Sequence, residues 1–495
     1  MQGLHLTSLL PILLLIGTAL VLPLIKKQAV VVRLSLATMA VVFVLLLLVG
    51  YDVYLVDHYV ATIGHYDGPF GITFDIGPIE AVIGLLFVVV TAMVVWYSGF
   101  SIDKEIKPNR INLYYALIHL LLASLLGTIF TSDLFNGYIF IEISTLSACG
   151  LIAVKDKAET IKATMKYLIL SSLGSGLVLM GIAYLYSTTG HLNMWAIHET
   201  LLLHGAGNER VILVSLTLFT IGLGIKSAMF PLHIWLPDAH SSAPGPSSAI
   251  LSGIVIKAPV IFLFKVFYMV YGNQILQETY ILTLLLVFGA AGMIVGSLLA
   301  RVQTDLKRLI AYSSVAQMGY IFFGIGLGNS LGLAIAIYHI IAHGLTKSCL
   351  FLAVSSFIEQ TGHREIEKMR GIGREMPLTM ALFSINALSM VGIPVLPGFI
   401  TKWNLSLATI ESGRVYLLLI ILASSLLSIS YYFPIIINGY FGDSNLKGKL
   451  YQSKSKPIIE LLPLILLSAL MVAAGFASGP IIDWIAGVLT FFEGN

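Results

Sequence analysis

The stretch GLGIKSAMFPLHIWLPDAHSSAPGPSSAILSGIVIKAPV, from Gly222 to Val260, sets the expected fold of this chain. It places Lys226 in one apolar run and Lys257 in the next, with four prolines between them. A lysine inside a membrane-spanning helix costs roughly 3 kcal/mol on insertion scales and usually marks function. Proline in such a helix frees backbone carbonyls that only protein or a wet cavity can satisfy. We therefore expect a broken helix that forms part of an ion path.

The composition is that of a polytopic membrane protein. Of the 495 residues, 57% are hydrophobic and 11% are charged, whereas a soluble domain carries about 25% charged residues. The net charge of +3 indicates no nucleic-acid partner, because the basic residues lie in short loops between apolar runs. Both cysteines, Cys149 and Cys349, fall inside apolar runs, so no disulfide framework is expected. The lipid bilayer is therefore the first expected partner.

An all-α fold with about fourteen transmembrane helices is predicted, because runs of about 20 apolar residues can cross a bilayer as helices. The predicted spans are 5–25, 29–50, 76–98, 111–131, 133–154, 164–187, 211–236, 246–270, 279–300, 306–328, 331–357, 377–409, 415–438 and 458–480. The twelfth run is too long for one straight span. Pro394 and Pro397 are expected to break it, as prolines break the seventh.

The loops carry a strong charge asymmetry. With the N-terminus outside, the inside loops hold 21 of the 28 basic residues, including Lys447, Lys449, Lys454 and Lys456. The outside loops hold only Arg210 and Arg414. Basic residues are retained on the cytoplasmic side of a membrane. This pattern supports the helix count and predicts a multi-pass protein of the cell membrane, with both termini on the outer face.

A short internal repeat is visible in the sequence. The pattern at Ser124–Leu126 and Ser132–Leu134 recurs at Ser297–Leu299 and Thr304–Leu306, five predicted helices later. Five is odd, so the second copy is expected to lie upside down in the membrane, as in many transporters. The proline breaks expected in helices 7 and 12, also five helices apart, support this repeat. The expected segments are an N-terminal three-helix segment (1–110), the two repeats (111–272 and 273–440), and a C-terminal helix and tail (441–495).

Three segments resemble a known family of antiporter-like subunits. They are KSAMFPLHIWLPDAHSSAPGPSSAIL, QTDLKRLIAYSSVAQMGY and HIIAHGLTKSCLFL, and the similarity runs from about residue 110 to 440. The family is shared by Mrp-type cation/proton antiporters, respiratory NADH dehydrogenase, and membrane-bound hydrogenase and sulfur-reductase complexes. The resemblance implies fourteen helices with helices 4–8 and 9–13 as inverted repeats, proton transport, and other membrane subunits as partners. Gln317, Gly245 and Ser247 depart from the common family pattern.

The resemblance also implies a path of titratable side chains through the membrane. Its expected members are Glu142, Lys226, Lys257 and Lys402, with His339, His343 and Lys347 as relay groups. Proton transfer through an apolar slab needs groups that exchange protons near neutral pH, and burial and nearby charges tune such side chains to do so. We expect Glu142 to pair with Lys226, and Lys226 to release its proton toward Lys257. Lys402 is then the exit group.

Structural roles are the alternative for each of these residues. The lysines and Glu142 can pair only to stabilise the bundle, and Lys402 lies near enough to a helix end to snorkel outward. Lys265, within two turns of its helix end, is expected to snorkel. Lys307 and Arg308 are expected to enforce topology. His339 and His343, four residues apart, share a helix face; they can also serve as metal or haem ligands, or simply as hydrogen-bonded core residues.

Several activities have no support in the sequence. There is no P-loop lysine motif, no GxGxxG after a strand and no cysteine set for an iron–sulfur cluster. No cofactor is expected in this chain, so redox chemistry would belong to another subunit, and whether the complex is an enzyme stays open. The expected cargo is H⁺, with exchange for Na⁺ left open. A redox-driven ion pump is the favoured setting; an Mrp-type secondary antiporter and a non-transporting scaffold are the alternatives.

Overall fold

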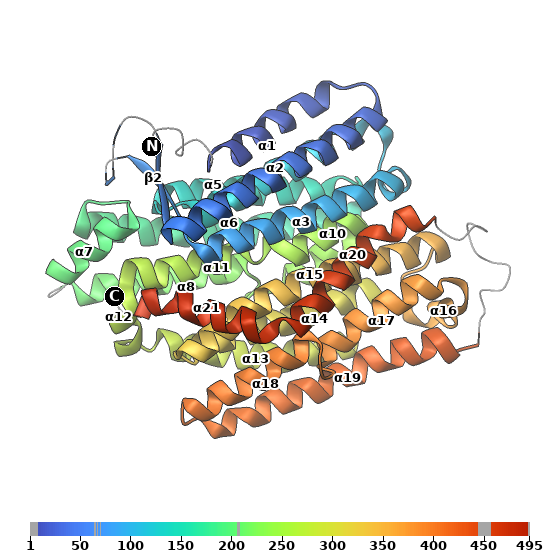
Figure 1. Cartoon of the computed structure of the whole chain (residues 1–495). Helices are drawn as coiled ribbons and strands as arrows, with labels where there is room; N and C mark the ends of the chain where they lie inside the picture. Colours follow the sequence, from blue (N-terminus) through green and yellow to red (C-terminus); the bar gives the residue numbers. More distant parts are fainter. Residues whose placement is uncertain are drawn as a thin grey trace.

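The computed structural model describes residues 8–63, 66, 68–69, 71–204, 208–443 and 457–493. Within these residues the chain is mostly helical, and the long helices lie side by side along a common direction (Figure 1). The short helices α7 (Met194–His204) and α12 (Gly272–Glu278) lie at one end of this bundle, and α16 (Ile372–Glu375) lies at the other. The predicted inside loop with Lys447, Lys449, Lys454 and Lys456 falls outside the described residues.

A small β-hairpin accompanies the three N-terminal helices α1 (Leu10–Val21), α2 (Gln28–Val56) and α3 (Pro78–Ser101). Strands β1 (Tyr59–Ile63) and β2 (Ile72–Ile76) pair antiparallel, so the all-α prediction is wrong at this point. Strand β2 (ITFDI) alternates apolar and polar residues with a period of two, whereas β1 (YVATI) does not. The hairpin was not predicted because a strand of five residues does not stand out beside apolar runs of about 20 residues.

The middle of the chain forms a group of helices around the stretch from Gly222 to Val260. Its long helices are α4 (Ile111–Phe130), α5 (Leu134–Ala153), α6 (Ala158–Thr189) and α8 (Glu209–Lys226). Its short pieces are α9 (Leu236–Ser242), α10 (Gly245–Ile250), the π-helical turns η5 (Leu251–Val255) and η6 (Val266–Tyr271), and α11 (Ala258–Lys265). The predicted seventh span is therefore broken at Lys226, and its second part is short.

The following part of the chain forms a second group of helices. They are α13 (Ile281–Arg301), α14 (Leu306–Gly326), α15 (Ser330–Thr361), α17 (Pro377–Val391), α18 (Pro397–Glu411) and α19 (Leu418–Phe441). Short 3₁₀ turns connect parts of the chain: η2 (Leu22–Leu24), η3 (Ile102–Lys104), η4 (Pro108–Arg110), η7 (Ile366–Met369) and η8 (Val415–Leu417). The predicted break of the twelfth span is present between α17 and α18.

The C-terminal segment contains two helices where one helix and a tail are predicted. Helix α20 (Ile458–Phe476) is followed after one residue by α21 (Ser478–Glu493). Helix α21 ends at the same end of the bundle as α7 and α12 (Figure 1). The prediction missed α21 because its apolar pattern includes Asp483 and two glycines and is shorter than a full span.

Eleven segments of the described chain are long and apolar enough to cross a membrane. The segments Leu10–Leu24 and Pro377–Val391 are apolar helices of shorter length. The prediction of about fourteen spans includes both of these helices. It also includes the broken seventh span, 211–236, of which α8 is the first part. The structure is thus a multi-span helical membrane protein, and the count of fourteen remains a prediction.

Helices α6 and α15 match each other in length and in how they end. Each has 32 residues, and α15 begins 172 positions after α6. Each is followed by a glycine in the left-handed conformation, Gly190 with φ 72° and Gly362 with φ 71°. A glycine in this conformation ends a helix without the strain that a side chain would add.

The starts of α5 and α14 match at the same offset of 172 residues. Asp133 caps α5 by accepting a hydrogen bond from a backbone N–H three residues on, and Asp305 caps α14 in the same way. Asp133 also forms an isolated backbone bridge with Asn193, and Asp305 forms one with Glu365. The aspartate caps supply acceptors to helix N-termini that otherwise keep unpaired donors.

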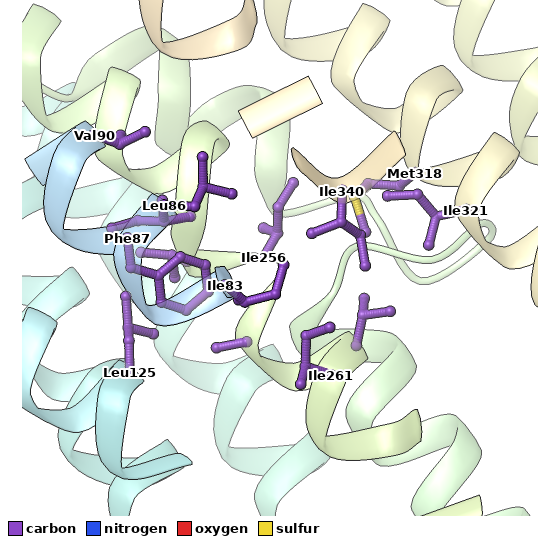
Figure 2. Close-up of a cluster of buried hydrophobic side chains, with 14 of the residues drawn as sticks. Ile83, Leu86, Phe87, Val90, Leu125, Ile256, Ile261, Met318, Ile321 and Ile340 are labelled. Atoms are coloured by element: carbon purple, nitrogen blue, oxygen red, sulfur yellow. The ribbon is translucent and has the colours of Figure 1, made fainter. Parts of the chain in front are cut away.

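Buried apolar side chains fill the space between the two groups of helices. Figure 2 shows Ile256 and Ile261 between α3 residues such as Phe87 on one side, and Met318 and Ile340 on the other. All five of these side chains are at most 1% exposed. Since Lys257 lies next to Ile256 in the chain, this packing places a charged group in a strongly apolar part of the protein.

Candidate functional site

Lys226 and Glu142 meet inside the bundle, as the sequence predicts. The Lys226 ammonium lies 3.2 Å from a Glu142 carboxylate oxygen and donates to the Thr145 hydroxyl at 2.8 Å. The Ser175 hydroxyl donates to the same Glu142 oxygen. Glu142 and Thr145 lie on α5, Ser175 lies on α6, and Lys226 is the last residue of α8. The pair is therefore fixed by three helices.

Glu142 is more exposed than Lys226. The Lys226 side chain is 4% exposed, whereas that of Glu142 is 30% exposed. Helix α5 lies on the side of the bundle and is only half covered within this chain. The sequence does not say which face of α5 is covered within the chain. Glu142 consequently faces both Lys226 and whatever lies outside α5.

The chain turns irregular directly after Lys226. Ala228 has a positive φ of 53°, and the segment from 227 to 235 has no regular helix. The Trp235 indole N–H donates at 2.8 Å to the carbonyl of Ile225, in the last turn of α8. Lys226 therefore sits where helix carbonyls are not all used internally, and a cation is favoured at that end of a helix.

Lys257 lies at the junction of η5 and α11 and is completely buried. Its ammonium donates to the carbonyl of Ser252, which the π-helical turn leaves accessible. Such turns inside helices often occur at functional sites. Lys257 interacts electrostatically with Lys347, His339 and His343. Among the described residues, no hydrogen bond joins Lys257 to Lys226.

His339 and His343 form a row in the second group of helices that reaches the residue before Lys402. The two imidazole rings on α15 are stacked, with centroids 5.7 Å apart. His339 Nδ1 lies 3.0 Å from the hydroxyl of Thr401, the residue before Lys402. Both ring nitrogens of His343 lack a partner within the described chain. A buried nitrogen with no partner is costly unless water or a moving proton satisfies it.

Lys402, on α18, binds the C-terminal end of α17 across the break between the two helices. Its ammonium donates to the carbonyls of Met390 at 3.1 Å and Val391 at 2.6 Å, the last two residues of α17. It also lies 5.6 Å from the centre of the Tyr320 ring. The residue is 7% exposed, so its side chain does not snorkel outward.

Lys347 points away from the histidine row. Its ammonium donates to the carbonyl of Ile310 at 3.1 Å, to the Ser313 hydroxyl and to the Tyr432 hydroxyl at 3.4 Å. These partners lie on α14 and α19. Lys347 is thus close enough to His343 for an electrostatic interaction. Its hydrogen bonds, however, are all to α14 and α19.

His240 and Lys307 belong to the same buried region, although the sequence pattern did not single out His240. His240 on α9 is 0% exposed, and neither ring nitrogen has a partner within the described chain. It interacts electrostatically with Lys307, Lys257 and Lys347. Lys307 is 2% exposed and donates to the carbonyl of Ala243. Lys307 thus has a structural contact inside the bundle, in addition to the topological role expected of it.

A cavity of about 400 Å³ reaches Lys307 from the end of the bundle that carries α16. Glu105 lines it, lies 2.5 Å from the Lys155 ammonium and accepts from the Gly245 N–H at 2.9 Å. Burial raises the pKa of the Glu105 carboxyl, but the charges of Lys155 and Lys307 outweigh this and hold the pKa below its ordinary value. The sequence feature that could have indicated this buried region is His240, which lies between Pro237 and Pro244.

Lys265 does not snorkel, contrary to the prediction. It is 0% exposed and donates to the carbonyls of Asp75 at 3.1 Å and Ile129 at 3.0 Å. A Glu80 carboxylate oxygen lies 3.9 Å away. The hairpin that carries Asp75 folds over the end of α11, so the lysine finds partners inside the protein before it reaches the surface.

The two histidines on α15 are also candidate metal ligands by sequence. Within the part of the chain that the structure describes, no three His, Cys, Asp or Glu side chains gather as a metal site. Metal sites in proteins use three or four such ligands.

This geometry defines a class of protein, a polytopic membrane protein with buried lysines near helix breaks and buried histidines between them. Such intramembrane charges are typical of ion paths in pumps and transporters. The particular family follows from residues 131–428, which match the family described as "NADH:quinone oxidoreductase/Mrp antiporter, TM". The chain belongs to this family.

Relatives of the chain carry two kinds of name. It is 38% identical over 372 residues to the NADH-quinone oxidoreductase subunit N of Desulforudis audaxviator, covering 75% of this chain and 73% of that protein. It is 30% identical over 434 residues to a Na(+)/H(+) antiporter subunit of Alkalihalophilus pseudofirmus, covering 88% and 86%. A chain of the membrane-bound sulfane sulfur reductase, an archaeal respiratory membrane complex, is 28% identical with a TM-score of 0.88, covering 98% and 97%.

Proposed function

We propose that this chain is the proton-translocating subunit of a multi-subunit membrane complex. The contact between Lys226 and Glu142 carries the proposal, because it sets a nearly buried cation beside a carboxylate at the end of a broken helix. Lys226 holds a proton while Glu142 stays close and gives it up when Glu142 is drawn away. Lys257 accepts the proton in the apolar core. His343 and His339 pass it to Lys402, and Lys347 adjusts the charge of this row.

The proposal includes fourteen transmembrane helices in two inverted repeats, at 111–272 and 273–440. The equal lengths of α6 and α15 and their matching glycine ends support the repeats. The equivalent caps and bridges of α5 and α14 support them as well. The N-terminal segment 1–110 and the C-terminal segment 441–495 flank the repeats. Both termini face outward from the cell membrane, since the inside loops hold most of the basic residues.

A redox-driven ion pump is the favoured setting, and the chain itself binds no cofactor. The relative named NADH-quinone oxidoreductase subunit N and the structural neighbour from a respiratory complex support this setting. A secondary antiporter that exchanges Na⁺ for H⁺ is the second candidate, supported by the relative that is named as a Na(+)/H(+) antiporter component. The retained side chains of the path argue against a scaffold without transport.

Substitution of Lys226 tests the proposed path. Lys226→Ala and Lys226→Arg should both reduce proton transport in sealed vesicles at least about a hundredfold, since each removes a group that exchanges protons. Arginine keeps the positive charge next to Glu142, but a guanidinium does not lose its proton in proteins. Full transport by an assembled Lys226→Arg variant would show that only the charge is needed. Lys368→Ala, in a loop where the lysine side chain is 46% exposed, is the matched control.

The subunits that accompany the chain distinguish the two settings. Gentle extraction from the native membrane, followed by mass spectrometry of the purified complex, identifies them. Nickel–iron or iron–sulfur polypeptides would establish a redox-driven pump. Only small membrane subunits and further antiporter-like chains would establish a secondary antiporter. A chain that is purified alone and still transports protons would contradict the proposed complex.

A further inference from the structure

A second cavity, of about 780 Å³, lies beside the one that leads to Lys307 and is lined differently. Helix α6 contributes Lys162, Lys166, Ile169 and Leu170, and the segment around α9 contributes Ile234 and Asp238. Arg308 and Arg364 complete one rim. We propose that this groove binds one anionic phospholipid, with the phosphate on the basic rim and an acyl chain on the apolar wall.

The rim is arranged to receive a negative charge. Four basic side chains and two acidic ones, Glu159 and Asp238, line the groove, which leaves it two positive charges in excess. Asp238 lies 2.7 Å from the Lys166 ammonium and 3.2 Å from the Arg308 guanidinium, so it fixes both cations at the rim. Lys162 and Arg364 form no ion pair within the described residues. A phosphodiester would supply the missing partner.

The wall below the rim is apolar and uncovered. Ile169 is 62% exposed and Ile234 is 53% exposed, and both line the groove. Lys162, Lys166, Ile169 and Leu170 share one face of α6 at helical spacing, so the face changes from basic to apolar along the helix. A soluble phosphate would gain nothing from this wall. An acyl chain would cover it.

The depth of these residues in a membrane fits a lipid. Helix α6 has 32 residues, which at 1.5 Å per residue makes it about 48 Å long, against a hydrocarbon core of about 30 Å. Its first turns therefore reach the headgroup level, where Lys162 and Lys166 lie, and Ile169 follows at the start of the hydrocarbon. Anionic lipids are concentrated in the cytoplasmic leaflet, on the side that the basic loops assign to this end.

The neighbouring cavity at Lys307 has a different character. There Lys104 pairs with Glu359 and Lys155 pairs with Glu105, and Ile358 is the one large apolar side chain among the described residues that line it, so this cavity offers no apolar wall to an acyl chain. The lipid is therefore assigned to the groove along α6. The inference does not depend on the proposed proton path, because none of the groove residues belongs to that path.

A photoreactive phosphatidylglycerol with a diazirine in its acyl chain tests the groove. The full chain, with the subunits that accompany it, is reconstituted into phosphatidylcholine nanodiscs containing the probe and irradiated. We expect crosslinks on peptides that contain Ile169 and Ile234. Lys162→Gln with Arg364→Gln should weaken labelling about thirtyfold, because each basic residue near an anionic surface contributes severalfold to binding. Arg301→Gln, an exposed cation at the same end of the bundle, should leave it unchanged.

Four results would overturn the proposal. Equal labelling by a phosphatidylcholine probe would show that the rim does not select charge. Loss of labelling in excess inorganic phosphate would show a site for the free anion alone. No labelling in the complex, with labelling of the chain when it is separated, would show that a partner subunit covers the groove. Unchanged labelling of the double variant in a folded complex would show that the rim is not the headgroup site.

Discussion

Glu142 is the residue through which a neighbouring subunit could act on Lys226. Its carboxylate contacts the Lys226 ammonium on one side and is 30% exposed on the other. Glu142→Gln keeps the shape of the side chain and removes its charge, so Lys226 loses its ionic partner but keeps the hydrogen bond to Thr145. We expect transport to fall roughly tenfold, less than the hundredfold or greater loss that removal of a proton-exchanging group gives.

Proton uptake by sealed vesicles measures this effect, with Glu367→Gln as control. The Glu367 side chain is 88% exposed and lies 3.9 Å from Arg370, far from the path in the fold. Unchanged transport by Glu142→Gln would mean that Lys226 works without a carboxylate partner. A loss as large as that of Lys226→Arg would mean that Glu142 itself exchanges protons.

His58 and Asp75 give the hairpin of β1 and β2 a pH dependence. His58 Nδ1 lies 3.0 Å from an Asp75 oxygen, and this hydrogen bond raises the pKa of His58 above its ordinary 6.5. Burial raises the pKa of Asp75, but the His58 hydrogen bond and the charge of Lys265 bring it below its ordinary 3.8. The pair therefore stabilises the hairpin fully between about pH 4 and 6.5, and the contribution of His58 is lost as the pH rises through its raised pKa.

Hydrogen exchange of the hairpin amides measures this stability. The protection factors of β1 and β2 should be higher at pH 6 than at pH 9. His58→Gln should make protection the same at both values, because glutamine carries no charge to lose. Equal protection of the unaltered protein at the two pH values would contradict the prediction.

At the scale of elements, the close approach of α6 and α8 positions the path. A Cβ at Gly222 would lie 2.6 Å from the carbonyl of Gly174, and one at Gly174 would lie 2.8 Å from the carbonyl of Gly222. Gly222 is one turn before Lys226, and Gly174 precedes Ser175, which donates to Glu142. Small residues allow membrane helices to pack this closely. The two glycines thus hold Lys226 and Glu142 in register.

Gly222→Ala should separate the two helices. We expect a loss of about 1–3 kcal/mol in the free energy of unfolding, typical of overpacking, and a loss of proton transport because Lys226 moves away from Glu142. Thermal unfolding of the purified protein and vesicle transport measure the two effects. Gly176→Ala on α6 is the matched control, since a Cβ there meets no atom within 4 Å. If both variants behave alike, the contact does not position the path.

The elements differ in how well the sequence predicts them. Long apolar runs such as α13 and α14 were predicted to within a few residues, because a membrane permits little besides a helix. The breaks after Lys226 and Val391 were predicted from prolines. The hairpin and α21 were missed, since both are shorter than a span. The partners of Lys265 were missed as well, because they come from segments far away in the chain.

At the scale of the whole molecule, the ends of α13 test the proposed orientation. Tyr280, just before this helix, is 89% exposed, and Val302, just after it, is 70% exposed. The proposed topology places Tyr280 outside the cell and Val302 inside, where the basic loops gather. Both native cysteines, Cys149 and Cys349, are buried. A membrane-impermeant thiol reagent therefore meets little background in the folded protein.

Tyr280→Cys in intact cells should react with this reagent at once. Val302→Cys should react only after the membrane is opened, because the bilayer and the packed bundle separate it from the outside solution. Inside-out vesicles should give the reverse result, which controls for differences in intrinsic reactivity between the two thiols. If Val302→Cys were labelled in intact cells and Tyr280→Cys were not, the chain would be inverted. The cavity that leads to Lys307 would then open to the outside of the cell.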